Sequence, residues 1–169
     1  SGDGEPAAAQ RRARQAEGCA AAETRLKRGR YGDVIWGGGY LTVDEVEAAM
    51  ALGEKNHPGV LERITLPHLT WEKRRCHAFH IGTDRGKKRL AACFLAGVHG
   101  REWGGPDILV YLGMILSRAY RDGKSIRLGH EVFTPAQVRA IVETMDVVVF
   151  PQVNPDGRHF SMERYPWWR

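Results

Sequence analysis

Apolar and polar residues follow a helical period over the first patterned stretch of the chain. Within residues 43–50 the apolar side chains recur on one face, and Thr42 stands where it can cap a helix while Glu45 reaches back to its amide. Pro58 forces the residue before it out of helical geometry. We therefore expect a helix that starts after Thr42 and ends within residues 53–56.

Two further stretches carry the same helical period. Residues 104–120 place apolar side chains at helical spacing, and Pro106 stands where a first helical turn accepts proline. Residues 134–145 show a second, shorter pattern of this kind. The chain is therefore predicted to contain three helices after residue 40.

Strand patterns lie between these helices. Residues 76–81 and 89–98 are predicted to pair as a hairpin through the polar link 83–88, and the second strand is apolar enough to be central. A third buried strand is expected at residues 146–153, closed by a turn at residues 154–157. Strands that alternate with helices predict an α/β fold, a mixed β-sheet with helices on both faces.

Composition and charge narrow the class of protein. The 169 residues include 43% hydrophobic and 27% charged residues, which is typical of a folded domain. No apolar run approaches the ~20 residues of a transmembrane helix, so we expect no membrane partner. Residues 1–30 hold seven Lys or Arg against four Asp or Glu, out of a net charge of +5. This basic, flexible tail lacks interleaved aromatics, and we expect no nucleic-acid partner.

The cysteines and the first residue give little further information about the fold or the cellular location. Cys76 and Cys93 flank the predicted hairpin, where they would face each other or remain as two buried free thiols. Because the chain starts at Ser1, we expect a processed, truncated or cloned product, and the sequence indicates no cellular location.

The most informative polar residues are His99 and Glu102, which stand three residues apart where the apolar strand ends. An imidazole and a carboxylate at this spacing can converge on one ion from a single tight turn, and zinc takes such ligands at about 2.0–2.2 Å. A catalytic zinc also needs a third protein ligand and an open position for water. The spacing alone is common in proteins, so the surrounding sequence has to decide.

That surrounding sequence resembles a known family. Residues 96–112, AGVHGREWGGPDILVYL, are similar to the strand, His-x-Arg-Glu-Trp motif and helix of zinc carboxypeptidases of the carboxypeptidase A and B type. Residues 40–58 resemble the family's opening helix, and residues 151–157 resemble its strand ending in Asn-Pro-Asp-Gly. Trp168 and Arg169 match its Trp-Arg pair.

The resemblance implies roles for four residues within a zinc carboxypeptidase domain whose N-terminal part would be residues 31–169. His99 and Glu102 would be ligands to Zn2+, the implied cofactor. Arg101 would contact the bound peptide, and Arg169 would act catalytically by stabilising the oxyanion. The implied substrates are the C-termini of peptides or proteins.

The departures from the family pattern also carry predictions. The family continues with an Asn-Arg pair, a third zinc ligand, a Tyr and a general-base Glu, all beyond the last residue of this chain. We therefore expect an incomplete portion that binds zinc weakly and turns over nothing. Recruitment of His130 or His159 as a third ligand stays open. Lys73 stands where many members have Gly.

Two other interpretations stay open at this point. The tetrapeptide His99-Gly100-Arg101-Glu102 also resembles the His-Gly-Asn-Glu motif of zinc deacylases of the desuccinylase and aspartoacylase type, although the flanking segments favour the peptidase. A non-catalytic scaffold or interaction protein would keep the same fold without the chemistry.

Overall fold

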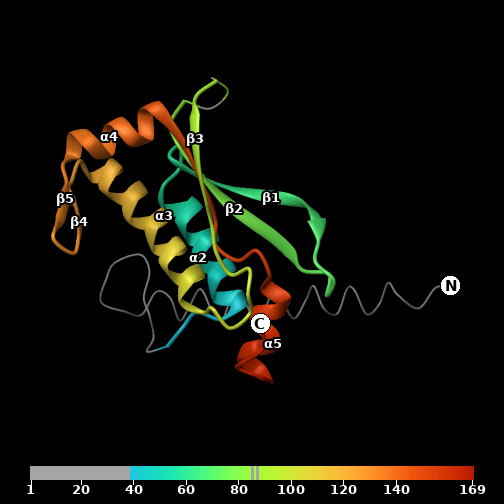
Figure 1. The fold of residues 1–169 in the computed structure, drawn as a ribbon. Helices are drawn as coiled ribbons and strands as arrows, with labels where there is room; N and C mark the ends of the chain where they lie inside the picture. Colours follow the sequence, from blue (N-terminus) through green and yellow to red (C-terminus); the bar gives the residue numbers. More distant parts are fainter. Residues whose placement is uncertain (1–38, 85, 87) are drawn as a thin grey trace.

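A four-stranded mixed sheet forms the centre of the molecule. The computed structural model describes residues 39–84, 86 and 88–169, so the tail predicted at residues 1–30 lies outside the described residues. The strand order is β1-β2-β6-β3. The pair β1/β2 and the pair β2/β6 are antiparallel, whereas β3 and β6 are parallel (Figure 1). The strands are β1 (Leu61–Leu69), β2 (Arg75–Ile81), β3 (Leu90–Leu95) and β6 (Met145–Phe150).

The predicted helices are present. Thr42 and Glu45 form the expected capping box at the start of the first described helix, α2. Pro106 lies in the first turn of α3, and Thr134 forms a second capping box, with Gln137, at α4. None of the helices within the described residues is long and apolar enough to cross a membrane. The helices are α2 (Val43–Asn56), α3 (Gly104–Asp122), α4 (Pro135–Thr144) and α5 (Pro155–Glu163).

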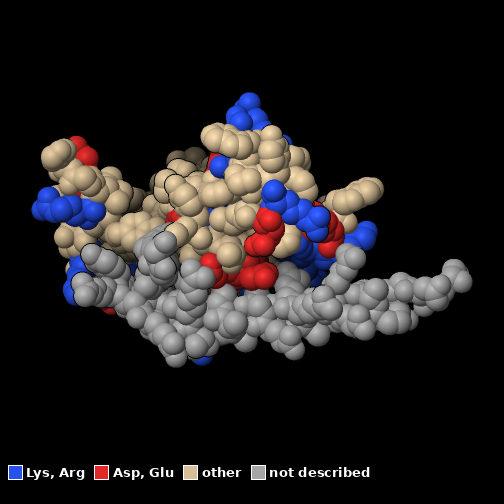
Figure 2. Space-filling view, turned by 90° about the horizontal axis from the view of Figure 1, so that it is seen from below, with Lys and Arg blue, Asp and Glu red and all other residues tan. Residues whose placement is uncertain are grey.

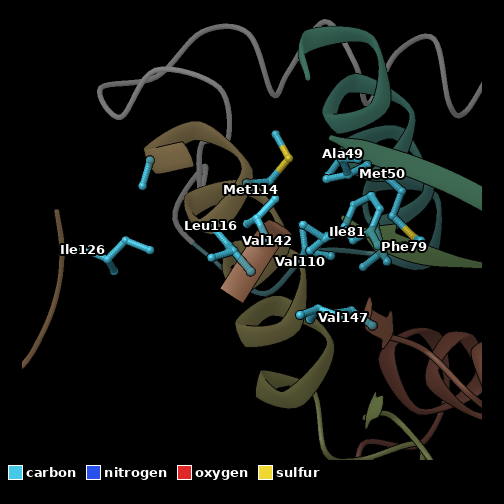
Figure 3. Packing of buried hydrophobic residues seen from close by; sticks show 14 of the residues in the cluster. Ala49, Met50, Phe79, Ile81, Val110, Met114, Leu116, Ile126, Val142 and Val147 are labelled. Carbon is cyan, nitrogen blue, oxygen red and sulfur yellow. The ribbon is translucent and has the colours of Figure 1, made fainter. Parts of the chain in front are cut away.

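The hydrophobic core lies between the sheet and helices α2, α3 and α4 (Figures 1 and 3). Phe79 of β2 is fully buried, and its ring lies so close to α3 that a Cβ on Gly113 would be 2.7 Å from it. Val147 of β6 and Val142 of α4 extend the same cluster. The inward-facing residues of β2 and β6 therefore attach three helices to one sheet. The α/β class and the mixed sheet are confirmed.

The hairpin predicted between residues 76–81 and 89–98 is wrong. The strand β6 lies between β2 and β3, because the chain crosses over through α3 and α4 before it returns in parallel to β3. The strand expected at residues 89–98 is shorter, Leu90–Leu95, and lies at the edge of the described sheet rather than at its centre. Cys76 and Cys93 therefore do not face each other. Both are free thiols, Cys76 buried and Cys93 exposed.

The turn expected at residues 154–157 is instead the start of a helix. Asn154 caps α5 by accepting a hydrogen bond from Gly157 N at 2.9 Å, and Pro155 takes the first helical position. The pattern also missed β1 and the small hairpin of β4 (Ile126–Leu128) and β5 (Glu131–Phe133). Short or charge-rich strands of this kind give no clear alternation of apolar residues.

Lys73 has the backbone conformation that favours glycine. Its φ is 65°, and it is the one non-glycine residue with positive φ in the described part of the chain. A side chain in this region costs roughly 1–2 kcal/mol relative to glycine. The position where the family pattern has Gly is thus one where glycine would relieve strain.

Charged side chains of both signs lie on the surface among uncharged ones. Figure 2 shows acidic groups beside basic ones near the middle of the face seen from below, with further basic groups toward its edges. Several are paired, as in the contact of Arg74 with Asp156 at 2.6 Å and the helical pair Arg118 and Asp122 at 3.6 Å. The pair of Arg74 and Asp156 is half-buried, whereas exposed pairs such as that of Arg118 and Asp122 add little to stability individually.

Candidate functional site

The candidate site lies where the parallel strands β3 and β6 end. Ala96 N donates to Phe150 O at 3.1 Å, and Val153 N donates back to Ala96 O at 2.9 Å. Asn154 N then donates to Gly97 O at 2.9 Å, so the two loops run side by side. Gly97 has a φ of 65°, which turns the chain away from the strand direction. The carboxyl ends of parallel strands are where α/β sheets place ligand sites.

His99 and Glu102 lie on one tight turn between β3 and α3. Glu102 N donates to His99 O at 3.1 Å, which closes the turn. His99 is half-buried, whereas the Glu102 side chain is exposed and has no hydrogen-bond or ion-pair partner among the residues that the structure describes. The structure therefore places the two predicted ligands at neighbouring positions on one exposed turn.

Arg169 is brought to the same place from the other end of the sequence. Its Nη2 lies 3.3 Å from His99 Nε2. A guanidinium can only donate hydrogen bonds, so the imidazole Nε2 is the acceptor. Arg101 is exposed on the turn and forms no hydrogen bond or ion pair with either residue within the described chain. His99, Arg101 and Glu102 thus share one turn, and Arg169 joins this turn through its contact with His99.

Helix α5 packs directly behind this turn. A Cβ on Gly100 would meet the Gly157 carbonyl and the Trp168 ring, so the two backbones approach as closely as glycine permits. Asn154 Nδ2 donates to Val98 O at 3.3 Å. Pattern analysis missed Arg158 and Ser161 of α5, which also contact the turn. The only available signal was the Asn-Pro pair, which is typical of a helix start as well as of a turn.

A buried ion pair lies beneath the site. Arg158 is 1% exposed and contacts Asp107 at 3.0 Å. Burial lowers the pKa of the Arg158 guanidinium, and the Asp107 carboxylate opposes that shift. Burial likewise raises the pKa of Asp107, against the hydrogen bond from Leu41 N and the charge of Arg158. Each charge would be strongly unfavourable here without the other.

The donor set matches zinc in kind and is incomplete in number. Imidazole nitrogen and carboxylate oxygen are ordinary zinc ligands. The described residues contain no group of three His, Cys, Asp or Glu side chains that could hold a metal. Arg169 also engages His99 Nε2, and metal binding through either ring nitrogen requires this contact to open. A metal bound at Nε2 would need the lone pair that now accepts from Arg169. A metal bound at Nδ1 would leave a proton on Nε2, which would then face the Arg169 donor.

These features define a class of protein: an α/β domain that presents an imidazole and a carboxylate on a turn at the carboxyl end of a mixed sheet. A family model described as "Zinc carboxypeptidase" matches residues 46–169. The chain therefore belongs to the zinc carboxypeptidase family.

Individual relatives agree with this assignment. The chain is 25% identical to mouse Carboxypeptidase A4 over 140 residues, which cover 83% of this chain and 30% of that protein. It is 32% identical to Metallocarboxypeptidase A of Trichophyton tonsurans over 99 residues, 58% of this chain and 21% of that protein. The chain thus spans less than a third of the length of these curated relatives.

Solved structures show the same fold. The carboxypeptidase A of Helicoverpa armigera superposes with a TM-score of 0.65 at 18% identity, covering 95% of this chain and 35% of that one. Thrombin activatable fibrinolysis inhibitor also gives a TM-score of 0.65, at 17% identity, over 90% of this chain. The mixed sheet and its helices are therefore those of the carboxypeptidase fold.

Proposed function

We propose that this chain supplies two ligands, His99 and Glu102, to the zinc site of a metallocarboxypeptidase that removes C-terminal residues from peptides. The observation that carries the proposal is the shared turn, which closes through the Glu102 N to His99 O hydrogen bond at the carboxyl end of β3. Family membership supports the identity of the metal. Bound zinc would polarise the scissile carbonyl and activate a water molecule.

The two arginines take the remaining proposed roles. Arg169, 3.3 Å from His99, would donate hydrogen bonds to the oxygen that becomes negative as the peptide carbonyl is attacked. Arg101, exposed on the same turn, would contact the bound peptide. A guanidinium suits both tasks because it keeps its charge and presents several donors in a fixed plane.

The proposal includes an expectation about this chain by itself. Two protein ligands hold an ion weakly, and no third ligand joins them among the described residues. We therefore infer that the 169-residue chain binds zinc weakly, and that full affinity and hydrolysis need further donors.

The test is a measurement of zinc affinity by competition with a chelator. His99→Ala and Glu102→Ala are each expected to weaken binding by at least about tenfold, because each removes one of two ligands. His130→Ala is the matched control, since it removes another imidazole from an exposed position remote from the turn. This variant is expected to bind as the native chain does.

The other results would redirect the interpretation. If His130→Ala or His159→Ala weakened binding as much as His99→Ala, the ligand set would differ from the proposed pair. If every variant bound as weakly as the native chain, the turn would carry no specific metal site, and the non-catalytic scaffold would be favoured.

A further inference from the structure

Helix α5 holds the site turn through one buried hydroxyl. Ser161 is fully buried, and its Oγ donates to Gly100 O at 2.7 Å. The same oxygen accepts a hydrogen bond from the indole Nε1 of Trp103, also at 2.7 Å. Gly100 directly follows His99, and Trp103 directly follows Glu102. One side chain therefore holds the turn next to both proposed ligands.

Arg158 holds the turn from one helical turn earlier. Its Nη1 donates to Trp103 O at 2.8 Å, and its other nitrogens donate to Leu41 O. Its Nη2 also contacts Asp107 in the first turn of α3 at 3.0 Å. The guanidinium thus joins α5 to the last residue of the site turn, to the start of α3 and to the segment before α2.

These bonds outnumber those that the turn makes internally. Between residues 99 and 103, the backbone bond inside the turn that the structure records is Glu102 N to His99 O. Gly100 O, Trp103 O and the Trp103 indole all bond to α5 instead. The strand that precedes the turn offers little support, because no side chain of β3 is buried in the described structure. Position and conformation of the turn therefore depend on α5.

We propose that Ser161 and Arg158 are positioning residues, which fix the turn that carries His99 and Glu102 and so set its metal affinity. The link to metal affinity rests on the proposed function above, whereas the hold on the turn does not. Outer residues that orient metal ligands typically change affinity by about 10–100-fold when they are removed.

Hydrogen exchange in the full chain tests the hold on the turn without any metal. Ser161→Ala is expected to speed exchange of the Trp103 indole N–H by about tenfold, because the indole loses its acceptor. Exchange of the Glu102 amide is expected to rise by a similar factor, because Gly100 O loses its donor and the turn that Glu102 N closes on His99 O is no longer held. Ser161→Thr retains the hydroxyl and is expected to restore slow exchange. Thr134→Ala is the control, because it removes a helix cap at α4, away from the turn.

Arg158 needs a conservative variant, because its complete removal would leave the Asp107 carboxylate buried and unpaired. Arg158→Lys keeps a charge for Asp107 and loses the planar fork that reaches Trp103 and Leu41 together. Faster exchange of the Glu102 amide is expected in this variant, by a smaller factor than in Ser161→Ala.

The outcomes separate the two proposals. Unchanged exchange at Glu102 and Trp103 in Ser161→Ala, or an equal increase in Thr134→Ala, would overturn the positioning role whatever the zinc result. If the native chain holds a specific zinc ion, Ser161→Ala is expected to weaken it about tenfold and Ser161→Thr to leave it unchanged. If native and His99→Ala chains hold zinc equally, the proposed function fails, while faster exchange in Ser161→Ala still supports the hold on the turn.

Discussion

The two parallel strands β6 and β3 lie side by side but differ in what surrounds their side chains. Val147 and Val149 of β6 are 4% and 0% exposed, whereas Leu90 and Leu95 of β3 are 78% and 61% exposed. The strand β6 has a neighbour on each side and α4 packed against it, while β3 pairs with β6 alone in the described sheet. Apolar composition is similar in both strands, so position in the sheet produces the difference.

This difference means that the residues that stabilise the fold and the residues of the candidate site lie on different strands. Most of the buried apolar side chains of the described core come from β2, β6 and the three helices that pack on them. The turn with His99 and Glu102 follows β3, which contributes no buried side chain to the described core. A site on such a strand needs support from elsewhere, and α5 supplies it from the end of β6. Changes in the core should therefore alter stability, and changes near β3 should alter the site.

The largest expected effect sharpens this contrast through the same substitution made in a buried strand, β2, and in the exposed strand β3. Phe79 of β2 is 0% exposed, and Phe94 of β3 is 42% exposed. Phe79→Ala is expected to lower the free energy of unfolding by about 3–5 kcal/mol, since it leaves a cavity against α3. Phe94→Ala is expected to cost about 1 kcal/mol or less, as is usual for surface positions. Urea denaturation of both variants measures the difference. Equal losses would show that β3 belongs to the stabilising core.

The same contrast explains which parts of the fold were predictable. Helix α2 was predictable from local signals, because Thr42 and Glu45 cap it and Pro58 follows it. The pairing of strands was not, because β3 is as apolar as a central strand, and only the long crossover through α3 and α4 places β6 beside it. Apolar composition indicates a strand but does not specify its neighbours.

The shared turn of the two proposed ligands was predictable from the sequence, and the contacts that support this turn were not. The spacing of His99 and Glu102 indicated one turn, and the structure places them on one turn. Lys73 was noted as a departure from a glycine position, and its φ of 65° gives the physical reason. Ser161 carries no such signal. A lone serine in a sequence does not show that its hydroxyl will be buried against Gly100 and Trp103, which lie 61 and 58 positions earlier in the chain.

The next largest effect concerns the two described cysteines, of which one lies in the buried strand β2 and the other in the exposed strand β3. Cys76 of β2 is buried, and burial together with the charge of Glu47 raises the pKa of its thiol from 9.0 to about 11. Its thiolate fraction at neutral pH is then about a hundredfold below that of an unperturbed cysteine. Cys93 of β3 is exposed. Iodoacetamide is therefore expected to label Cys93 at least about a hundredfold faster than Cys76 in the native chain.

Peptide mapping by mass spectrometry measures the two rates separately and also resolves Cys19, which lies outside the described residues. In concentrated urea Cys76 and Cys93 are expected to react at similar rates, because unfolding removes the difference in burial. Slow labelling of Cys93 in the native chain would mean that β3 is covered in solution, which would break the contrast between the strands.

The smallest effect tests the polar contacts that connect the buried strands β2 and β6 to the start of the exposed strand β3. Asp146, at the start of β6, accepts hydrogen bonds from Arg89 at 2.8 Å and from His80 at 2.9 Å. Those bonds lower the pKa of the Asp146 carboxyl below 3.8. A carboxyl whose pKa is lower in the folded state stabilises the fold above its unfolded pKa of about 3.9, and this stabilisation is lost as the pH falls through the folded value.

Asp146→Asn removes that ionisation, so the variant should be less stable than the native chain at neutral pH. The gap in urea midpoint is expected to narrow steadily below about pH 4 and to close where the native carboxyl is protonated. Because Asp146 is solvent-accessible, the gap at neutral pH should be small. A gap that stays constant from neutral to acid pH would mean that Asp146 acts through packing rather than charge. The join between β6 and the start of β3 would then not depend on the ion pair with Arg89.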